Sequence, residues 1–129
     1  MADGKLSANF KRKEFWCKGE DCCNHSLHVH PQLIDSLETL RALVLVPLII
    51  NSGYRCKKHN DEIGGEINSY HMSGLAADVR CPKHLTVLQF AEFASLVPLF
   101  YAGGIGLYDT FIHVDIRGDG KARWDRRTA

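Results

Sequence analysis

Hydrophobic residues recur at helical spacing in two stretches of the chain, each bounded by prolines. The first stretch follows Pro31 and carries Leu33, Leu37, Leu40 and Val44, and the second follows Pro82 and carries Val87, Phe90, Ala91, Ala94 and Val97. Residues three or four apart lie on one face of an α-helix, and proline suits a first helical turn but interrupts a helix interior. The pattern predicts two amphipathic helices, one from Pro31 to just before Pro47 and one from Pro82 to Pro98.

Shorter runs between and after these helices predict strands and one further helix. Four runs have the length and composition of strands: 48–51, 76–81, 103–108 and 110–117. The last two are joined at Asp109 as a candidate hairpin, and a short helix over residues 55–63 ends at Gly64. Trp124 is expected to fold back onto the sheet. The order of elements predicts an α+β fold: a small, mostly antiparallel sheet with helices packed on it.

Length and composition indicate a single domain. The chain has 129 residues, of which 45% are hydrophobic and 24% charged, which is enough for one core but leaves little room for a second. Residues 1–30 form an amino-terminal arm with a Cys/His-rich loop, anchored by Phe10, Phe15 and Trp16, and belong to the same domain as residues 31–129. We expect a monomer.

The balance of charge and the apolar runs limit the partners. The formal net charge is +1, so nucleic acid is not an expected partner. The longest apolar run, Ala42–Ile50, is interrupted by Pro47 and is too short to span a bilayer, and Met1–Phe10 is too polar for a signal peptide. These features predict no membrane partner and a product that is cytoplasmic as synthesised.

The candidate chemistry lies in two segments, Ser69–Asp78 and Phe111–Asp115. His71, Asp78 and His113 supply two imidazoles and one carboxylate, a donor set that suits Zn²⁺ and leaves a fourth position for water or substrate. Taken singly, each residue reads as a satisfied or solvated side chain. Gly74 argues against a continuous helix here, and together the residues favour a zinc site on one sheet face.

Three ordered motifs carry a resemblance to a known family. They are the Ser69–Asp78 segment, Ser52–Arg55 with Asn60 following, and the glycine-rich 103–106 stretch leading into 111–115. Over roughly residues 30 to 124 the chain resembles the zinc D-alanyl-D-alanine carboxypeptidases and murein peptidases, which include phage endolysins and whose zinc site resembles that of the hedgehog signalling domain. The resemblance implies an α+β fold and a zinc peptidase.

The same resemblance implies roles for individual residues. His71, Asp78 and His113 correspond to the zinc ligands, and Arg55 to a residue facing the reacting carbonyl, where a guanidinium stabilises the developing oxyanion. Without the family match, Arg55 reads as an arginine paired with a carboxylate. Ser69 corresponds to a substrate-binding serine, with a turn-forming hydroxyl as the alternative.

The proton acceptor is where the sequence departs from well-known members of this family. Several members carry a carboxylate three residues before the last zinc histidine, but here that position is Thr110. Asp115 and Asp109 are the substitutes, and we favour Asp115 as the catalytic carboxylate because the strand pleat aims it to the same side as His113. The alternative for Asp115 is a partner that orients a ligand imidazole or pairs with Arg117.

Five cysteines in a chain without a signal sequence indicate thiols rather than a disulfide framework. Cys17, Cys22 and Cys23 lie close to three histidines, and this cluster is a candidate for a second, structural zinc ion, although the spacing fits no standard finger. The alternative is a loop closed by packing, with Cys56 nearby.

Two functions follow from these observations. The first is zinc-dependent hydrolysis of peptide bonds in peptidoglycan stem peptides, of the carboxypeptidase or endolysin type, by a phage-type enzyme that acts on the cell wall. The second is a zinc-stabilised binding or particle-assembly module without turnover, which the threonine at position 110 keeps open.

Overall fold

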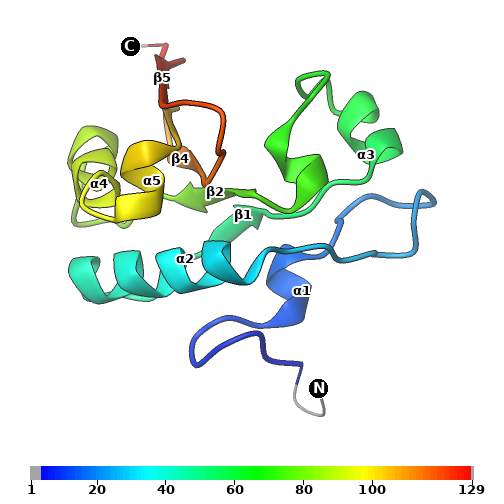
Figure 1. The fold of residues 1–129 in the computed structure, drawn as a ribbon, viewed down its shortest axis with the longest axis horizontal. Helices are drawn as coiled ribbons and strands as arrows, with labels where there is room; N and C mark the ends of the chain where they lie inside the picture. Colours follow the sequence, from blue (N-terminus) through cyan, green and yellow to red (C-terminus); the bar gives the residue numbers. More distant parts are fainter. Residues whose placement is uncertain (1–3, 129) are drawn as a thin grey trace.

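A five-stranded sheet runs through the molecule and carries the predicted site. The computed structural model describes residues 4–128. The sheet order is β1 (Ile50–Ser52), β2 (Ala76–Arg80), β4 (Phe111–Asp115), β3 (Gly104–Leu107) and β5 (Ala122–Asp125). Neighbouring strands are antiparallel except β3 and β5, which are parallel. The predicted α+β fold with a mostly antiparallel sheet is confirmed (Figure 1).

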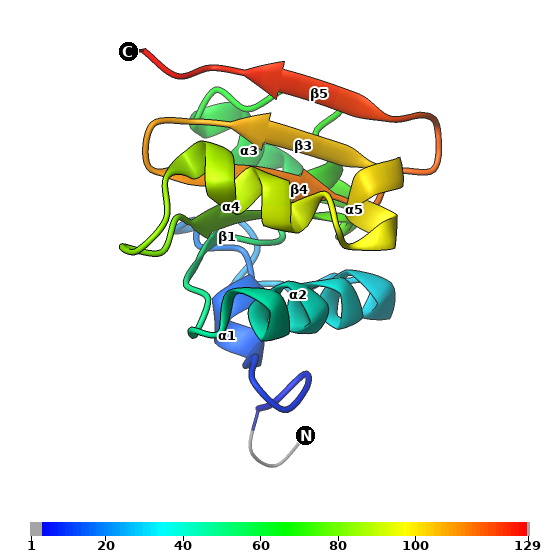
Figure 2. The same cartoon turned by 90° about the vertical axis from the view of Figure 1, so that its left-hand side faces the viewer.

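The helices lie on both sides of the sheet and below it (Figure 1). They are α1 (Arg12–Phe15), α2 (Pro31–Val44), α3 (Lys57–Glu62), the 3-10 helix η1 (Tyr70–Ser73), α4 (Val87–Ala94) and α5 (Pro98–Ala102). Figure 2 shows α4 and α5 in front of the sheet, with α2 beneath them and in contact with both. Within residues 4–128, every helix is too short or too polar to cross a membrane.

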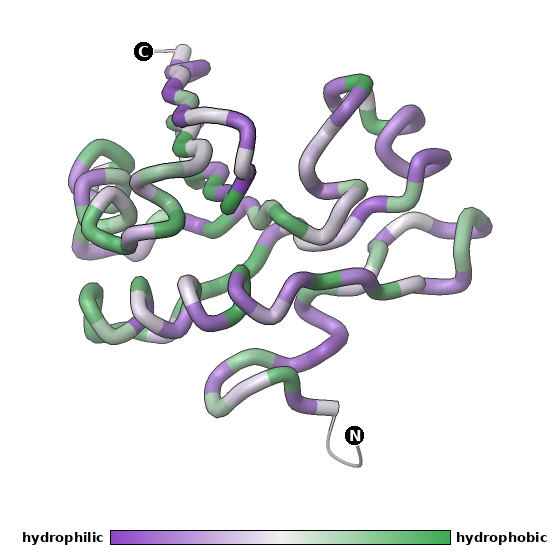
Figure 3. Tube along the Cα trace, viewed as in Figure 1, coloured by the Kyte–Doolittle hydropathy of each residue, from purple (hydrophilic) through white to green (hydrophobic). Residues whose placement is uncertain are grey.

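The core forms where α2 packs on α4 and α5, and α4 packs on β3 and β4. Every residue of the predicted stripe on α2 is buried, as are Phe90, Ala91 and Ala94 of α4. Burying each large side chain stabilises the fold by about 2 kcal/mol before the cost of ordering the chain. Figure 3 shows green, hydrophobic positions interspersed with purple ones along α2, whereas the segment around α3 is mostly hydrophilic.

The helix boundaries follow from local capping. Pro31 is the first residue of α2, as predicted, and Leu45 ends the helix in a left-handed conformation with φ 66°. The predicted start of the second helix at Pro82 was wrong, because Thr86 caps α4: its hydroxyl accepts from Gln89 N while the Gln89 side chain accepts from Thr86 N. Pro98 begins the additional helix α5 rather than only ending α4.

The amino-terminal arm packs on the core through Phe10 and Phe15. Both rings are fully buried and meet edge to face, with centroids 5.7 Å apart. The arm is also held by Glu38 of α2, whose carboxylate accepts hydrogen bonds from Ser7 Oγ, Asn9 N and Asn9 Nδ2. Burial alone raises the pKa of Glu38, but these hydrogen bonds outweigh it and lower the pKa.

Candidate metal centre

The sheet and η1 bring the three predicted ligands together. Asp78 in β2 and His113 in β4 are directly opposite each other in the antiparallel register, and His71 lies on η1, just before β2. All three residues are buried, each with 8% or less of its surface exposed. The turn between η1 and β2 depends on Gly74, whose φ is 74° and where a Cβ would lie 2.5 Å from the carbonyl oxygen of His28.

The three donor atoms have the spacing of a tetrahedral metal site. Asp78 Oδ1 lies 3.3 Å from His71 Nε2 and 3.3 Å from His113 Nδ1, and all three atoms are within 4.8 Å of one another. Zinc bonds to nitrogen and oxygen of about 2.0–2.1 Å imply ligand-to-ligand edges of about 3.3 Å in a tetrahedron. The residues present therefore fit a zinc ion.

The outer nitrogen of each imidazole fixes which nitrogen faces the centre. His71 Nδ1 donates to the carbonyl oxygen of Gly53 at 2.7 Å, and His113 Nε2 donates to Asp115 Oδ2 at 2.7 Å. Both partners can only accept, so the protons of the neutral rings lie on the outer nitrogens. The inner nitrogens then present lone pairs to a carboxylate oxygen, and three acceptors facing one another call for a cation between them.

The electrostatics of the centre favour the ligand forms of Asp78 and His71. Burial alone raises the pKa of Asp78, but the two imidazoles outweigh it and hold the pKa well below its ordinary value. Burial lowers the pKa of His71 and prevails over the nearby carboxylate, so this ring is neutral at neutral pH. Burial also acts to lower the pKa of His113, but the charged ring, with a proton on each nitrogen, donates to both Asp115 and Asp78, and these hydrogen bonds prevail and raise the pKa.

Asp115 lies behind His113 and has no exposed surface. Its Oδ2 accepts from His113 Nε2 and Arg117 Nη2, both at 2.7 Å, and its Oδ1 accepts from Gly104 N, Arg117 N and Arg117 Nε at 2.9 to 3.1 Å. A Cβ on Gly104 would overlap this carboxylate, so the glycine permits the close approach. The sequence favours Asp115 as the proton acceptor, but its five hydrogen bonds favour the alternative, a residue that orients His113 and pairs with Arg117.

Arg55 also contacts a ligand directly. Its Nη2 donates to Asp78 Oδ2 at 3.0 Å, while Nε donates to Ser52 Oγ at 3.1 Å and Nη1 to Asn60 Oδ1 at 3.4 Å. Asp78 is therefore held through both oxygens, one toward the imidazoles and one toward the guanidinium. This is the carboxylate pairing expected of Arg55 without a family match, although its side chain also lines the cavity described below.

The remaining predicted residues divide between the site and the surface. Ser69 Oγ accepts from His71 N at 3.2 Å and caps η1, which is its turn-forming alternative, and the residue also lines the cavity. Asp109 and Thr110 line a separate surface hollow, and the Asp109 carboxylate binds Thr128 N and Oγ1 at 2.9 and 2.8 Å. Neither residue faces the three ligands.

A cavity of about 620 Å³ opens over the candidate centre. Its wall includes aromatic rings and charged groups that the sequence did not single out as site residues: Glu66, Tyr70, Tyr108, Phe111, Arg117, Trp124 and Arg126. Trp124 lies on β5 with its ring 5.0 Å from that of His113, so its predicted return to the sheet also completes the site wall. Alternation along β4 predicted that Phe111 shares a face with His113, but the loop that supplies Glu66 gave no such signal.

Comparison with known proteins assigns the chain to a class of enzymes. The family model described as Peptidase M15 matches residues 8–115, so the chain belongs to this family of zinc peptidases, which confirms the resemblance seen in the motifs. The match begins earlier than the motifs suggested and includes most of the amino-terminal arm. A search of curated proteins found no match to the chain. The family acts on peptides, and its members use zinc, which the candidate centre suits.

Proposed function

We propose that this protein is a zinc-dependent peptidase that hydrolyses peptide bonds in peptidoglycan stem peptides, as a D-alanyl-D-alanine carboxypeptidase or a murein endopeptidase of the endolysin type. The observation that carries the proposal is the convergence of His71 Nε2, Asp78 Oδ1 and His113 Nδ1 at the floor of an open cavity. Three protein ligands leave one coordination position for water or substrate. When bound, zinc polarises the peptide carbonyl and lowers the pKa of water toward ~7.

The protein groups around the ligands supply the remaining functions. Asp115 keeps the proton of His113 on Nε2, which leaves Nδ1 free for the metal. Arg55 fixes Asp78 and retains N–H groups beyond its three hydrogen bonds, and in this proposal these donate to the oxyanion that develops on the carbonyl. Ser69 binds the substrate backbone from the rim of the cavity.

A proton acceptor is needed, and Glu66 is our candidate. Among the described residues, the carboxylates that line the cavity are Asp78 and Glu66, and Asp78 is bound on both oxygens. The Glu66 side chain is 78% exposed, and its ion pair with Arg126 is long at 3.5 Å. Its loop begins at Gly64 and Gly65, so the carboxylate is held loosely enough to approach a substrate. Glu66→Gln should lower kcat by about 100-fold or more with zinc content unchanged, and Glu62→Gln on α3 serves as the matched control.

The character of the cavity supports an acidic peptide as substrate. Arg117 and Arg126 line it beside Arg55, and the guanidinium of Arg117 lies over the ring of Tyr70, 4.2 Å from the ring centroid. Guanidinium groups bind carboxylates through paired hydrogen bonds, and the aromatic wall offers an apolar surface to small side chains. Stem peptides combine free carboxylates with alanine methyl groups.

The test is hydrolysis of purified peptidoglycan and synthetic stem peptides by zinc-loaded protein. We expect new amines, with the cleaved bond identified by mass spectrometry, and we expect chelation to abolish their release and added zinc to restore it. His71→Ala should be inactive, whereas His84→Ala, a change at an exposed histidine, should be active.

The binding module remains the second candidate because Asp109 and Asp115, the carboxylates nearest His113 in sequence, are both engaged elsewhere. Zinc-loaded, folded protein that releases no amines but co-sediments with peptidoglycan would support that function and reject hydrolysis.

A further inference from the structure

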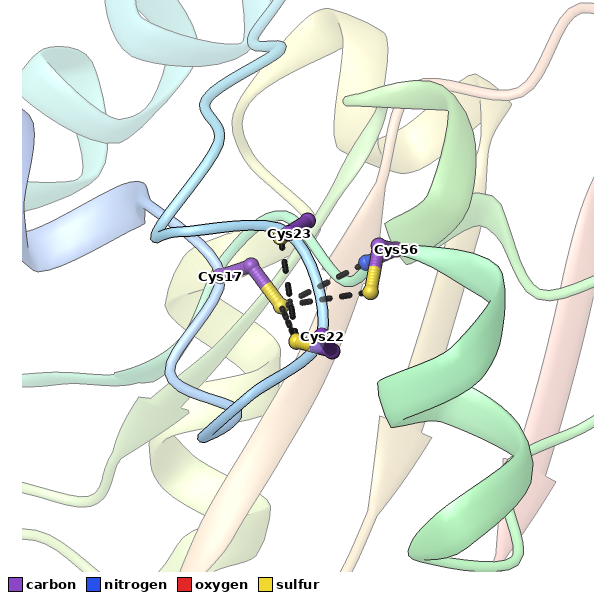
Figure 4. A group of neighbouring side chains, drawn as sticks. All are labelled: Cys17, Cys22, Cys23 and Cys56. Atoms are coloured by element: carbon purple, nitrogen blue, oxygen red, sulfur yellow. Dashed lines mark hydrogen bonds between the residues drawn. The ribbon is translucent and has the colours of Figure 1, made fainter.

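Four cysteine thiols meet at a point away from the candidate centre. Cys17, Cys22 and Cys23 come from the loop after α1, and Cys56 is the residue that caps α3 (Figure 4). The Sγ atom of Cys17 lies 3.8 Å from those of Cys22 and Cys56, and the Sγ atoms of Cys22 and Cys23 are also 3.8 Å apart. All four sulfur atoms lie within 4.8 Å of one another.

These distances match the edges of a zinc tetrahedron. A Zn–S bond of about 2.3 Å implies S-to-S edges of about 3.8 Å, whereas a disulfide would hold two sulfur atoms about 2.05 Å apart. All five cysteines of the chain are unbridged. A packed apolar loop has no reason to bring four sulfur atoms within 4.8 Å of one another, three pairs of them at 3.8 Å, while a metal ion does.

The backbone around the thiols is arranged as it is around metal-bound sulfur. Cys56 N donates to Cys17 Sγ at 3.5 Å, His59 N to Cys56 Sγ at 3.4 Å and Ser26 N to Cys23 Sγ at 3.4 Å. Such N–H groups stabilise thiolates and orient them toward a shared ion.

The histidines near this loop are engaged elsewhere. His25 Nδ1 donates to the carbonyl oxygen of Cys17 at 2.7 Å, the ring of His28 packs against Tyr54, and His30 Nδ1 accepts from Gln32 N as the cap of α2. The fourth member of the group is therefore Cys56, from a distant segment, and not a histidine from the same loop.

We propose that Cys17, Cys22, Cys23 and Cys56 bind one structural zinc ion. Four protein ligands close the coordination sphere, so this ion has no position for substrate and takes no part in hydrolysis. Binding converts four thiols to thiolates and releases four protons for each zinc ion taken up. The sequence offered the first three cysteines as a candidate site beside a packed loop, and the structure adds Cys56 as a fourth ligand.

The position of this site gives it a role in the fold. It joins the loop of the amino-terminal arm to the start of α3, two segments that are also linked by a hydrogen bond from Lys58 Nζ to the carbonyl oxygen of Asp21 at 2.7 Å. Cys56 directly follows Arg55, whose guanidinium holds Asp78. A zinc ion at Cys56 therefore fixes the segment that carries Arg55 and stabilises the candidate catalytic centre from outside.

The test is a metal count on purified, reduced protein supplied with zinc. We expect two zinc ions per chain in the wild-type protein and one in Cys22→Ser and Cys56→Ser. Cys81→Ser, which changes the cysteine outside the cluster, should keep two ions and is the matched control. His71→Ala should keep one ion, held by the thiols, so the result does not depend on peptidase activity.

Cobalt substitution gives a second readout that needs no cysteine variant to fold. Wild-type protein and His71→Ala should both show strong thiolate-to-cobalt charge-transfer absorption, in proportion to one tetrathiolate site per chain. A wild-type chain that binds one zinc ion, lost on His71→Ala, and shows no such absorption would overturn the proposal. Iron in place of zinc in the isolated, zinc-supplied protein would also overturn it.

Discussion

Replacing Asp115 by asparagine tests whether this buried carboxylate orients His113 or accepts a proton. The amide has nearly the same shape, so the change removes one acceptor and adds a donor. Placing the amide oxygen at Oδ1 retains three hydrogen bonds, and the new NH₂ group then faces His113 Nε2 and Arg117 Nη2, each at 2.7 Å. The opposite orientation would place the NH₂ group against the three N–H donors of Gly104 and Arg117, and is therefore less stable than the first.

The new NH₂ group and the N–H of His113 Nε2 are both donors, and His113 can remove this repulsion only by moving its proton to Nδ1. With the proton on Nδ1, Nε2 accepts from the new amide, but the nitrogen that faces Asp78 and the metal is then blocked. Losing the outer partner of a ligating histidine typically weakens metal binding 10- to 100-fold, which corresponds to about 1.4–2.8 kcal/mol. In the metal-free protein this proton shift leaves Arg117 Nη2 as the buried donor without an acceptor, so the free energy of unfolding should also fall by roughly 1–3 kcal/mol.

The assay measures zinc affinity and turnover separately. Competition with a chromogenic chelator gives the dissociation constant of the His71, Asp78 and His113 centre, and denaturant unfolding gives stability. Asp125→Asn, which alters an exposed carboxylate paired with Arg127, should match the wild type in both. If Asp115→Asn bound zinc within twofold of the wild type while kcat fell 100-fold or more, Asp115 would be the proton acceptor and the positioning role would be refuted.

Three further changes test other parts of the structure. Gly74→Ala should lower the free energy of unfolding by at least about 2 kcal/mol, because a left-handed backbone conformation and a clash with a backbone carbonyl act together, whereas Gly118→Ala at an open position should have little effect in thermal denaturation. Glu38→Gln should destabilise the protein by about 1–3 kcal/mol at neutral pH. Because the pKa of Glu38 is lowered on folding, the difference in unfolding free energy between the wild type and this variant should be complete above the ordinary glutamate pKa of about 4.3. It should vanish as the pH falls through the lowered pKa. A difference that does not depend on pH in denaturant titrations would contradict this role of Glu38. Arg55→Lys keeps the positive charge but loses the planar guanidinium that holds Asp78, and should reduce zinc affinity about tenfold in the chelator assay. Unchanged zinc affinity with a lower kcat would mean that Arg55 does not position Asp78 and acts only on the substrate carbonyl.

The sequence predicted the elements that local periodicity specifies. Helix α2 begins at Pro31 because the apolar stripe and the proline agree, and alternation along β4 correctly placed His113 and Asp115 on one face, opposite the buried Ile112 and Val114. Strand β5 was not predicted. Its four residues alternate between half-buried and exposed positions, but so short a run is a weak signal, and the strand pairs in parallel with β3 rather than with β4, which precedes it in the chain. Tertiary pairing, not propensity, makes this segment a strand.

The sequence likewise predicted part of the candidate site and not the rest. The motifs indicated three metal-binding residues, His71, Asp78 and His113, and the fold places their donor atoms within 4.8 Å of one another. It could not show which oxygen of Asp115 meets which nitrogen of His113, because that depends on Gly104 and Arg117 approaching the same carboxylate. Likewise, no spacing rule links a cysteine at position 56 to a loop nearly forty residues earlier.

The pairing of Asp78 with His113 across two adjacent strands makes metal uptake a reporter of correct assembly. Side chains alternate between the two sides of a strand, so a slip of β2 by one position against β4 would send one donor to the opposite side of the sheet. A misaligned pair of strands would still be rich in β-structure by spectroscopy, yet it would have no place to hold the ion. The stoichiometry of metal bound by His71, Asp78 and His113 therefore measures the share of molecules whose strands joined in the native alignment.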